Sequence, residues 1–473
     1  MIFNQNFSFA NTPPLNITSI IVNLVIFIVV LIGAIILFWR LKITSKGYKL
    51  LFVFYTFFWF PLMLVRSYRG TLNNDLEVSP LLLFIPLSVY GFVGIFVRPL
   101  FDWMGARFQS RKAIIFIALW IQLITFLPVA IAPSFATNVI QAVGVGIGAS
   151  CIGSFSLWFN EQHTRTKPFL TISILSLPPL IADFLASPIQ ALIRTTSPFG
   201  SSSSNIAIHA DPNWTAYLWV IAIIVILFSF AIGYFVKEKP DLVGLQQSQN
   251  KQVIKTKWQW IMLMGIVIVG ASIDFTKFAS ADAIATTTIQ HIGGSVNTRV
   301  FDGYVTSVFS IFQLIGGILM GFVGIRYFSK IVLYLFGAIF FIAYDLSVIL
   351  IARFDNNTLN GAIAYLGVQA LNGFGYGVLY NLLIAHILSL GFKTKNFSPL
   401  GLYQAIAALS ISAGTFFTSA VQGFLRADFA HVQFIINLTL ICVTLVMSFI
   451  YYFVNYIEKD FKHKPLWQIQ TKI

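Results

Sequence analysis

The chain has 473 residues, of which 57% are hydrophobic and only 10% are charged. A soluble globular protein carries roughly 25% charged residues, so this composition excludes that class and predicts a polytopic membrane protein. The formal net charge of +14 does not indicate a nucleic-acid partner, because the basic residues concentrate in alternate loops, as the positive-inside rule requires of cytoplasmic loops.

Apolar stretches of about 20 residues recur along the whole chain, and each can cross a hydrocarbon layer about 30 Å thick as a helix. Helices are expected because lipid satisfies no backbone polar group. The predicted spans are residues 17–39, 50–67, 81–101, 113–132, 135–159, 168–193, 215–236, 258–280, 303–325, 331–352, 359–386, 399–425 and 432–456.

The first predicted span is unlike the others in its flanks. The residues before Arg40 carry no charged side chain, whereas four basic residues occur from Arg40 to Lys49. This asymmetry predicts a multi-pass protein of the cell membrane with its N-terminus outside and its C-terminus cytoplasmic. No basic segment precedes the apolar stretch, so we expect it to be retained and not cleaved as a signal peptide. Residues 1–49 are thus predicted to be an extracellular tail followed by an extra transmembrane helix.

One loop pattern occurs twice. The sequence RPLFDWMGARFQSRK ends at Lys112, and GGILMGFVGIRYFSK ends at Lys330. A turn of glycine and basic residues between two apolar helices, repeated after almost half the chain, predicts a duplicated membrane bundle. The residues that recur at equal spacing are Asp102, Gly105, Arg107 and Arg111 in the first copy and Gly321, Gly324, Arg326 and Lys330 in the second.

Three further pairs of short segments recur in the same order, for example SPIQALIR before residue 195 and SAVQGFLR before residue 427. The predicted fold is therefore an all-α membrane protein with two pseudo-symmetric six-helix halves and one extra N-terminal helix. The predicted units are an N-terminal half at 50–236, a cytoplasmic linker at 237–257, a C-terminal half at 258–457 and a cytoplasmic tail at 458–473.

With this topology and loop, the chain resembles the major facilitator superfamily of secondary transporters. Asp102, Gly105 and Arg107 match the family's loop between helices 2 and 3, while Arg98 stands where its first glycine belongs. In the second copy, Gly321 replaces the acid. The resemblance implies alternating access, with these loops as a latch that helps close the cytoplasmic face. The alternative is a solvated positive-inside turn. The gating residues would be Asp102, Gly105, Arg107, Arg111, Lys112, Gly321, Gly324, Arg326 and Lys330.

The first loop also permits a physical interpretation. Asp102 lies where a predicted span ends, so its carboxylate can accept from helix N-terminal amides or pair with Arg107 or Arg111. Gly105 is expected to allow a tight turn.

The glycines at 144–148 and 373–377 are spaced two apart inside predicted helices, where small residues favour close helix packing.

Charged residues inside the predicted spans indicate where a solute binds, because each costs roughly 2.5–3.5 kcal/mol at mid-bilayer and usually faces a cavity. The candidate substrate-binding residues are Arg66, Asp183, Asp274 and Lys277. Arg66 and Lys277 lie in the outer halves of two helices that are pseudo-symmetry mates, so they could converge on one anion. Asp345 is expected to be a packing or assembly residue.

The aromatic run before Arg66 and the sequence KFASAD from Lys277 resemble organophosphate:phosphate antiporters. That subfamily has arginine where this chain has Lys277, and histidine in the neighbourhood of Asp183. Lysine is a point charge and not a bidentate fork, which weakens phosphate binding. Two structural alternatives remain open: the two cations reach to the outer headgroups, or Asp274 and Lys277 form a neutralised pair.

The sequence leaves three functions open. The first is secondary transport of a small polar solute, anionic or phosphorylated, through Arg66 and Lys277. The second is proton-coupled symport of a neutral solute such as a sugar, with Asp183 or Asp274 titrating. The third is a transporter-like sensor or assembly subunit. No ATP-binding loop, metal cluster or nucleophile is recognisable, so we expect neither an enzyme nor a cofactor. The expected partners are a small-molecule substrate, membrane lipid and a coupling ion, either a proton or phosphate.

Overall fold

The computed structural model describes most of the helical part of the chain. The described residues are 46–66, 84–163, 177–195, 212–243, 252–253, 257–280, 298–320, 327–354, 359–389, 392–393, 399–425 and 429–457, together with single positions between 21 and 36 and at 72, 76, 78, 82 and 324. The described positions between 21 and 36 are helical and exposed. The rest of the predicted extra helix, both chain termini, Gly321 and Arg326 lie outside the described residues.

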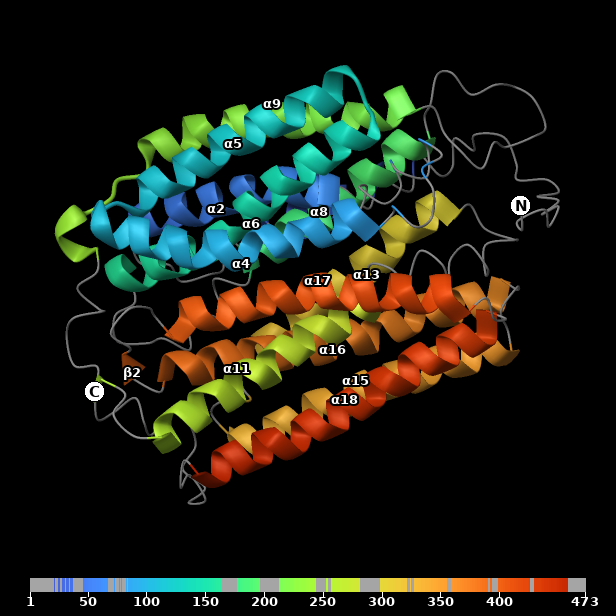
Figure 1. Ribbon diagram of the computed structural model, residues 1–473. Coiled ribbons are helices and arrows are strands. Elements are labelled where there is room, and N and C mark those ends of the chain that lie inside the picture. The colour runs from blue at the N-terminus through green and yellow to red at the C-terminus, as the bar shows by residue number, and fades with distance from the viewer. Residues whose placement is uncertain are drawn as a thin grey trace, which may run out of the picture.

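Long helices make up nearly all of the described chain, and they run side by side (Figure 1). The first six are α2 (Lys46–Arg66), α4 (Phe84–Arg107), α5 (Arg111–Ile131), α6 (Phe135–His163), α8 (Leu177–Thr195) and α9 (Pro212–Phe235). The last six are α11 (Lys257–Phe278), α13 (Thr298–Leu319), α15 (Lys330–Phe354), α16 (Leu359–Ser389), α17 (Pro399–Leu425) and α18 (Phe429–Ile457). The end of the bundle at which α9 ends and α11 begins is called the linker end below.

The two sets of six helices pack in the same way. In the first set, α2 packs on α8 and α9, α6 on α4 and α5, and α5 on α9. The second set repeats each contact in order: α11 packs on α17 and α18, α16 on α13 and α15, and α15 on α18. Each set also has its own large cluster of buried apolar side chains. The repeated contacts are what a duplicated six-helix unit produces.

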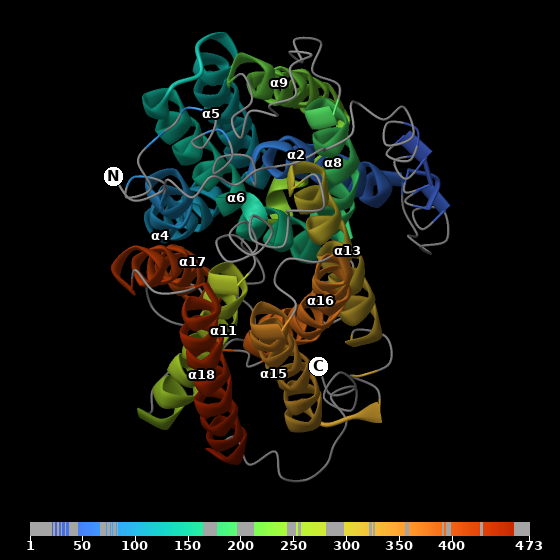
Figure 2. The same ribbon diagram turned by 90° about the vertical axis from the view of Figure 1, so that its right-hand side faces the viewer.

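The two halves meet along two helix pairs. Helix α4 packs on α17, and α8 packs on α13, so each pair joins a helix of one half to a helix of the other (Figure 2). The α4–α17 contact is close: a Cβ added at Gly91 would lie 2.5 Å from the carbonyl oxygen of Ala408. Ser412 donates a hydrogen bond to the carbonyl oxygen of Ser88 across the same contact.

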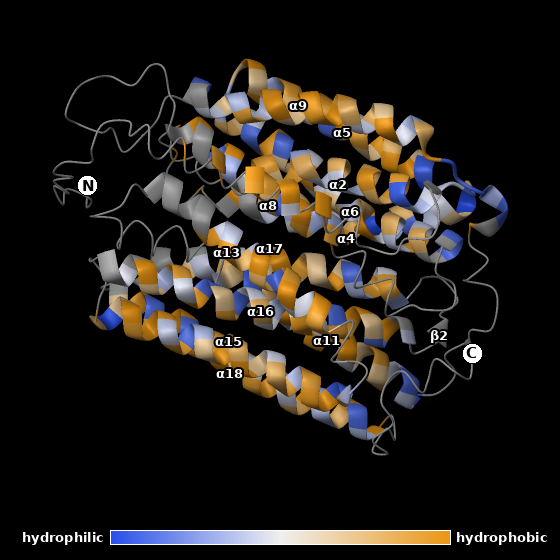
Figure 3. Cartoon of the chain, turned by 180° about the vertical axis from the view of Figure 1, so that it is seen from behind, coloured by the Kyte–Doolittle hydropathy of each residue, from blue (hydrophilic) through white to orange (hydrophobic). Residues whose placement is uncertain are grey.

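Eight of the described helices are long and apolar enough to cross a membrane, and hydrophobic residues cover most of their length (Figure 3). The remaining long helices, α4, α8, α13 and α16, are not among these eight over their described residues, and the described apolar part of α13, Val305–Leu319, is too short to be counted. Three of those four form the contacts between the halves.

Glycines on α16 permit close helix packing, as the sequence predicted. A Cβ at Gly373 would collide with the carbonyl oxygen of Phe309 on α13, and one at Gly377 would collide with that of Gln313. Because α13 approaches α16 this closely, the side chains that flank these glycines are held at fixed positions in the wall between the two helices.

The segment that joins the halves contains a short 3₁₀ helix, η2 (Pro240–Leu242), and a two-residue strand, β1 (Gln252–Val253). Strand β1 pairs in parallel with β2 (Phe392–Lys393), which lies between α16 and α17. The linker is thereby tied to the C-terminal half at the linker end.

Candidate functional site

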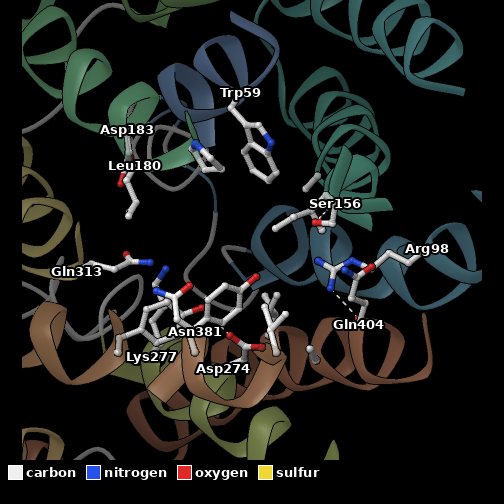
Figure 4. Close-up of a pocket in the computed structure, with 18 of the residues that line it drawn as sticks. Trp59, Arg98, Ser156, Leu180, Asp183, Asp274, Lys277, Gln313, Asn381 and Gln404 are labelled. Atoms are coloured by element: carbon white, nitrogen blue, oxygen red, sulfur yellow. Dashed lines mark hydrogen bonds between the residues drawn. The ribbon is translucent and has the colours of Figure 1, made fainter. Parts of the chain in front are cut away.

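A cavity of about 140 Å³ lies between the two halves (Figure 4). Helices α2, α4, α6 and α8 line it from the N-terminal half, and α11, α13, α16 and α17 line it from the C-terminal half. All four predicted substrate-binding residues contribute to its wall: Arg66, Asp183, Asp274 and Lys277. The cavity therefore brings together charges that lie more than 200 residues apart in the sequence.

Arg66 and Lys277 approach the same aromatic ring. The guanidinium of Arg66 lies 4.7 Å from the ring centroid of Phe278, and the ammonium of Lys277 lies 5.2 Å from it. Arg66 also lies over Tyr90, at 5.7 Å. A ring face attracts a cation, so Phe278 holds one cation of each half at the cavity. The two cations thus lie against one ring at the cavity, and their convergence on a bound anion stays a prediction.

Tyr376 on α16 connects two of the predicted charges. Its hydroxyl donates a hydrogen bond of 2.7 Å to Asp274, and its ring lies 4.4 Å from the ammonium of Lys277. Lys277 also lies 5.0 Å from the ring centroid of Phe309. Asp274 is 3% exposed, so its carboxylate is an almost fully buried part of the wall that depends on the tyrosine donor.

Asp183 joins the two halves directly. It lies on α8 and accepts a hydrogen bond from Ser310 on α13, one of the two helix pairs at which the halves meet. This hydrogen bond breaks when α8 and α13 separate, because its donor and acceptor belong to different halves. Asp183 is thus both a cavity residue and a contact between the halves.

Arg98 is a cavity residue that the sequence analysis did not assign to the site. It is 8% exposed, lines the cavity from α4, and donates from Nη1 to the carbonyl oxygen of Gln404 on α17 at 2.6 Å. Sequence comparison matched it only to a glycine of the loop motif. A charged residue inside an apolar span usually faces a cavity. By this rule, which selected Arg66, the arginine within the apolar run GIFVRPLF could also have been assigned to the site.

Several buried polar atoms of the wall have no partner among the described residues. They include Nε of Arg98, the hydroxyl of Tyr403, Oδ1 of Asn381 and Oε1 of Gln404. A buried polar group without a partner costs about 1–3 kcal/mol. A bound molecule with hydroxyl or acidic oxygens would satisfy both the donors and the acceptors, so these atoms point to a polar ligand.

The first predicted gating loop is shorter than the sequence indicated, because the preceding helix is longer. Helix α4 continues to Arg107, so Asp102 and Gly105 lie in its last turns and not in a loop. The chain turns instead at Gln109, which has a positive φ of 50°. Gly105 has a different use: a Cβ there would lie 2.6 Å from Nη1 of Arg111. The glycine leaves room for the guanidinium.

Arg111 pairs with a residue that the sequence did not indicate. It forms a fully buried ion pair with Glu161 on α6, at 3.1 Å, and it donates to the backbone carbonyl of Asp102 and not to the Asp102 carboxylate. Arg107 is exposed and lies outside this pair. The side chain of Asp102 is 7% exposed and lies beside Gly153 on α6, where the loop meets the bundle.

Glu238 closes the same loop from the linker. Its carboxylate accepts from the backbone N–H groups of Arg111 and Lys112 and from the Ser110 hydroxyl, at 2.7–3.3 Å, and so caps the N-terminus of α5. The ammonium of Lys112 donates to the carbonyls of Tyr234 and Val236 at the end of α9. A carboxylate at a helix N-terminus and a cation at a helix C-terminus are both favourable placements.

The second predicted gating loop has a lysine and a histidine in contact at the start of α15. Lys330 begins α15 as Arg111 begins α5, but its Nζ lies 3.3 Å from Nε2 of buried His386, where the first copy has Glu161. The other ring nitrogen of His386 lies 3.0 Å from the Tyr451 hydroxyl. Gly324 allows close contact with Leu333. In each half, the basic residue at the start of α5 or α15 thus meets a buried side chain near the end of α6 or α16.

No protein-family model matches the sequence, and no curated protein matches it. Among solved structures, the chain is similar to the major facilitator superfamily proton:xylose symporter XylE bound to 6-bromo-6-deoxy-D-glucose. The TM-score is 0.61 at 14% identity, over 86% of this chain and 95% of that chain. The chain has the major facilitator fold. A mutant of the nucleoside transporter NupG is also similar, with a TM-score of 0.57 at 14% identity, over 86% of this chain and 100% of that one. At this identity the likeness concerns the fold alone, so the solute must be argued from the cavity.

Proposed function

We propose that this chain is a secondary active transporter that moves a small anionic metabolite, such as a sugar phosphate, across the cell membrane by alternating access. The observation that carries the proposal is the charge of the central cavity. Among the described residues, three cations, Arg66, Arg98 and Lys277, line it against two carboxylates, Asp183 and Asp274. The excess of positive charge favours a solute that brings negative charge.

The two carboxylates offset part of the positive charge and leave one positive charge in excess among the described lining residues. Asp274 accepts from the Tyr376 hydroxyl and Asp183 accepts from the Ser310 hydroxyl, so each is stabilised by a neutral donor of the protein. The cations lie in a site of low dielectric constant, where their attraction for an anion is stronger than in water. Arg66 and Arg98 can each offer two parallel donors to a phosphate or carboxylate, and Lys277 adds a point charge.

The uncharged part of the wall suits the remainder of such a solute. Tyr403, Asn381 and Gln404 offer hydrogen-bonding atoms without partners in the described structure. Trp59 projects into the cavity and offers an aromatic face (Figure 4). Hydroxyl-bearing carbons can bind to such a combination of polar groups and rings, as ligand sites generally combine an apolar lining with a few polar groups.

Alternating access would consist of movement of the half at 50–236 against the half at 258–457. The contacts that must be remade are those that cross between the halves, including Asp183 with Ser310 and Arg98 with Gln404. The gating residues of the first loop would brace the linker end through the Arg111–Glu161 pair and the Glu238 cap. We further propose that the linker end is cytoplasmic, in line with its basic residues Lys46, Arg107, Lys112, Lys237 and Lys257.

Proton-coupled symport of a neutral solute is the second candidate. It is favoured by one observation, the hydrogen bond between Asp183 and Ser310 across the halves. Protonation of that carboxyl would weaken the bond and thereby link proton binding to movement of the halves. Transport that ignores a pH gradient and survives Asp→Asn at both Asp183 and Asp274 would exclude this candidate.

Thermal stabilisation of the purified protein by phosphorylated, carboxylate and neutral metabolites tests the proposal. A ligand at 100 times its dissociation constant adds about 2.7 kcal/mol of stability. We expect phosphorylated or carboxylate compounds to stabilise the protein. Loss of one charged hydrogen bond, about 1.5–3 kcal/mol, should weaken binding roughly tenfold or more in Arg66→Gln, Arg98→Gln and Lys277→Gln.

Arg353→Gln is the matched control, because Arg353 also lies over an aromatic ring, Phe354, but does not line the cavity. It should bind anions like the unmodified protein. Stabilisation by neutral solutes alone, unchanged in the three cavity variants, would refute the anionic solute.

A further inference from the structure

The carboxyl of Asp345 is buried in the C-terminal half, outside the cavity. It lies on α15 with an exposure of 0%, and neither of its oxygens has a hydrogen-bond partner in the described part of the chain. It does not line the cavity between the halves. Helix α15 packs on α16 and α18, so the carboxyl is enclosed by protein and is not exposed to lipid.

Polar side chains surround this part of α15. Tyr344, the neighbour of Asp345, accepts a hydrogen bond of 3.1 Å from Gln369 on α16 and interacts with Ser280 near the end of α11. Asn372 on α16 donates to the same Ser280, at 3.4 Å. The side-chain oxygens of Gln369 and Asn372 have no donor among the described residues. The cluster therefore holds more acceptors than donors.

The described side chains that face Asp345 provide no positive charge. Its own helix provides Tyr344, and α16 provides Tyr365, which packs with Tyr344. Helix α18 also packs on α15, and its buried polar residues Gln433, Asn437 and Thr444 do not titrate. The nearest buried titratable group on α18, Tyr451, stacks on Tyr334, about three helical turns from Asp345. His431 on α18 is exposed.

An ionised carboxylate without a partner is unfavourable at this depth. Insertion of an aspartate at the centre of a membrane helix costs roughly 2.5–3.5 kcal/mol, and such residues are normally paired or face a cavity. Among the described residues, Asp345 has no hydrogen-bond partner, and it does not line the cavity between the halves. A single proton removes the charge and needs no space, whereas a metal ion would need several oxygens around it. We propose that Asp345 is a proton-binding site, set behind the solute cavity and joined to it by polar side chains of α16.

The connection to the cavity follows one face of α16. Tyr365, Gln369, Asn372 and Tyr376 are spaced four, three and four residues apart, so they share a face, and all four are buried. At the cavity end of this row, Tyr376 donates to Asp274. Asp345 takes up one proton to become a neutral carboxylic acid. When it ionises, the proton passes to water that enters along this polar row and leaves it at the Asp274 carboxylate or in the cavity. The amides of Gln369 and Asn372 hydrogen-bond that water, and only the tyrosine hydroxyls and the water can relay the proton. This holds whichever solute the cavity binds.

Infrared spectroscopy of the purified protein in lipid bilayers tests the proton at Asp345. We expect the carbonyl-stretch band of a protonated carboxylic acid at neutral pH, its loss in Asp345→Asn, and a shifted band in Asp345→Glu. Ser347→Ala is the matched control, since it removes a polar group from the same helix whose hydroxyl is bonded to Ala343 of α15. It should keep the band.

A band that persists unchanged in Asp345→Asn overturns the proposal. If the asparagine variant does not fold, the glutamate variant decides: a shifted band supports the proposal, and a band at the original frequency overturns it. No solute is needed, so the outcome is independent of the test for anion binding.

Hydrogen–deuterium exchange of that band tests the row on α16. In heavy water the band should move as the acid proton is replaced. Gln369→Leu and Asn372→Leu should each slow the exchange several-fold, whereas Ser347→Ala should not. Exchange at an unchanged rate in both leucine variants would show that the proton does not use this row.

Discussion

Arg111 and Glu161 form an ion pair of 3.1 Å in which both side chains are entirely buried. The pair fixes the start of α5 against the end of α6 at the linker end. At the corresponding place in the other half, Lys330 meets His386. One half is therefore held by opposite charges, whereas the other is held by a lysine, an imidazole and the Tyr451 hydroxyl.

Removal of one partner of the buried pair should be strongly destabilising. Glu161→Ala leaves the guanidinium of Arg111 buried without its counter-charge, which costs about 3–5 kcal/mol. The double variant Arg111→Met with Glu161→Leu removes both charges and should recover most of that loss. Thermal unfolding of the purified variants measures both effects. A loss below about 1 kcal/mol in Glu161→Ala would mean that the pair contributes no more than an exposed one.

Loss of the Glu238 cap should weaken the start of α5. Glu238→Ala removes the acceptor of the Arg111 and Lys112 amides, and cap removal costs about 0.5–2 kcal/mol. Hydrogen exchange at these amides should accelerate accordingly. Asp241→Ala is the control, because Asp241 is an exposed acid three residues further along the same linker. Equal effects of the two substitutions would argue against capping.

Two glycines of α16 give a matched test of helix packing. Gly373→Ala places a methyl group against the Phe309 carbonyl, and such overpacking costs about 1–3 kcal/mol. Gly367→Ala meets no atom within 4 Å and should stabilise the helix by up to about 1 kcal/mol, since alanine is the better helix former. Thermal unfolding distinguishes the two. Equal melting temperatures would contradict the close α13–α16 contact.

Ser310→Ala should shift the balance between conformations. It removes the donor to Asp183 across the halves, and a hydrogen bond to a charged group contributes about 1.5–3 kcal/mol. Gln109 and Ser329 lie at the linker end of each half. The distance between spin labels at these two positions, measured by double electron–electron resonance, reports the separation of the halves. We expect a changed distance distribution in Ser310→Ala.

Ser272→Ala is the control for that experiment, because the Ser272 hydroxyl is bonded to Val269 of its own helix. Identical distance distributions for Ser310→Ala and the unmodified protein would show that this bond does not determine the conformation.

The sequence predicted the two six-helix halves because its strongest features are physical necessities, whereas the extra N-terminal helix stays a prediction. Apolar stretches must be helical in lipid, and a duplicated loop pattern indicates duplicated packing. The cavity charges Arg66, Asp183, Asp274 and Lys277 could be selected because a charge within an apolar helix is costly and needs a reason. Their binding roles remain predictions.

What the sequence could not predict depends on tertiary contacts. Glu161 and Glu238 look like ordinary charges near helix ends, and only the folded bundle brings them to the two sides of Arg111. Gly105 suggested a turn because glycine is common there, but the structure uses its missing side chain as space for a guanidinium. Arg98 was read as part of a motif, which concealed that it faces the cavity from the middle of α4.

The close contact of Gly91 with Ala408 is a position at which a substitution can alter the packing between the halves. The halves meet along the α4–α17 and α8–α13 contacts, and at Gly91 the first of these contacts has no room for a methyl group. A small side chain at residue 91 would act as a wedge on one side of the protein only. It would leave the charged wall of the cavity chemically unaltered. Substitution here thus changes the packing between the halves without changing the side chains of the cavity, which is what is needed to trap one conformation for structure determination.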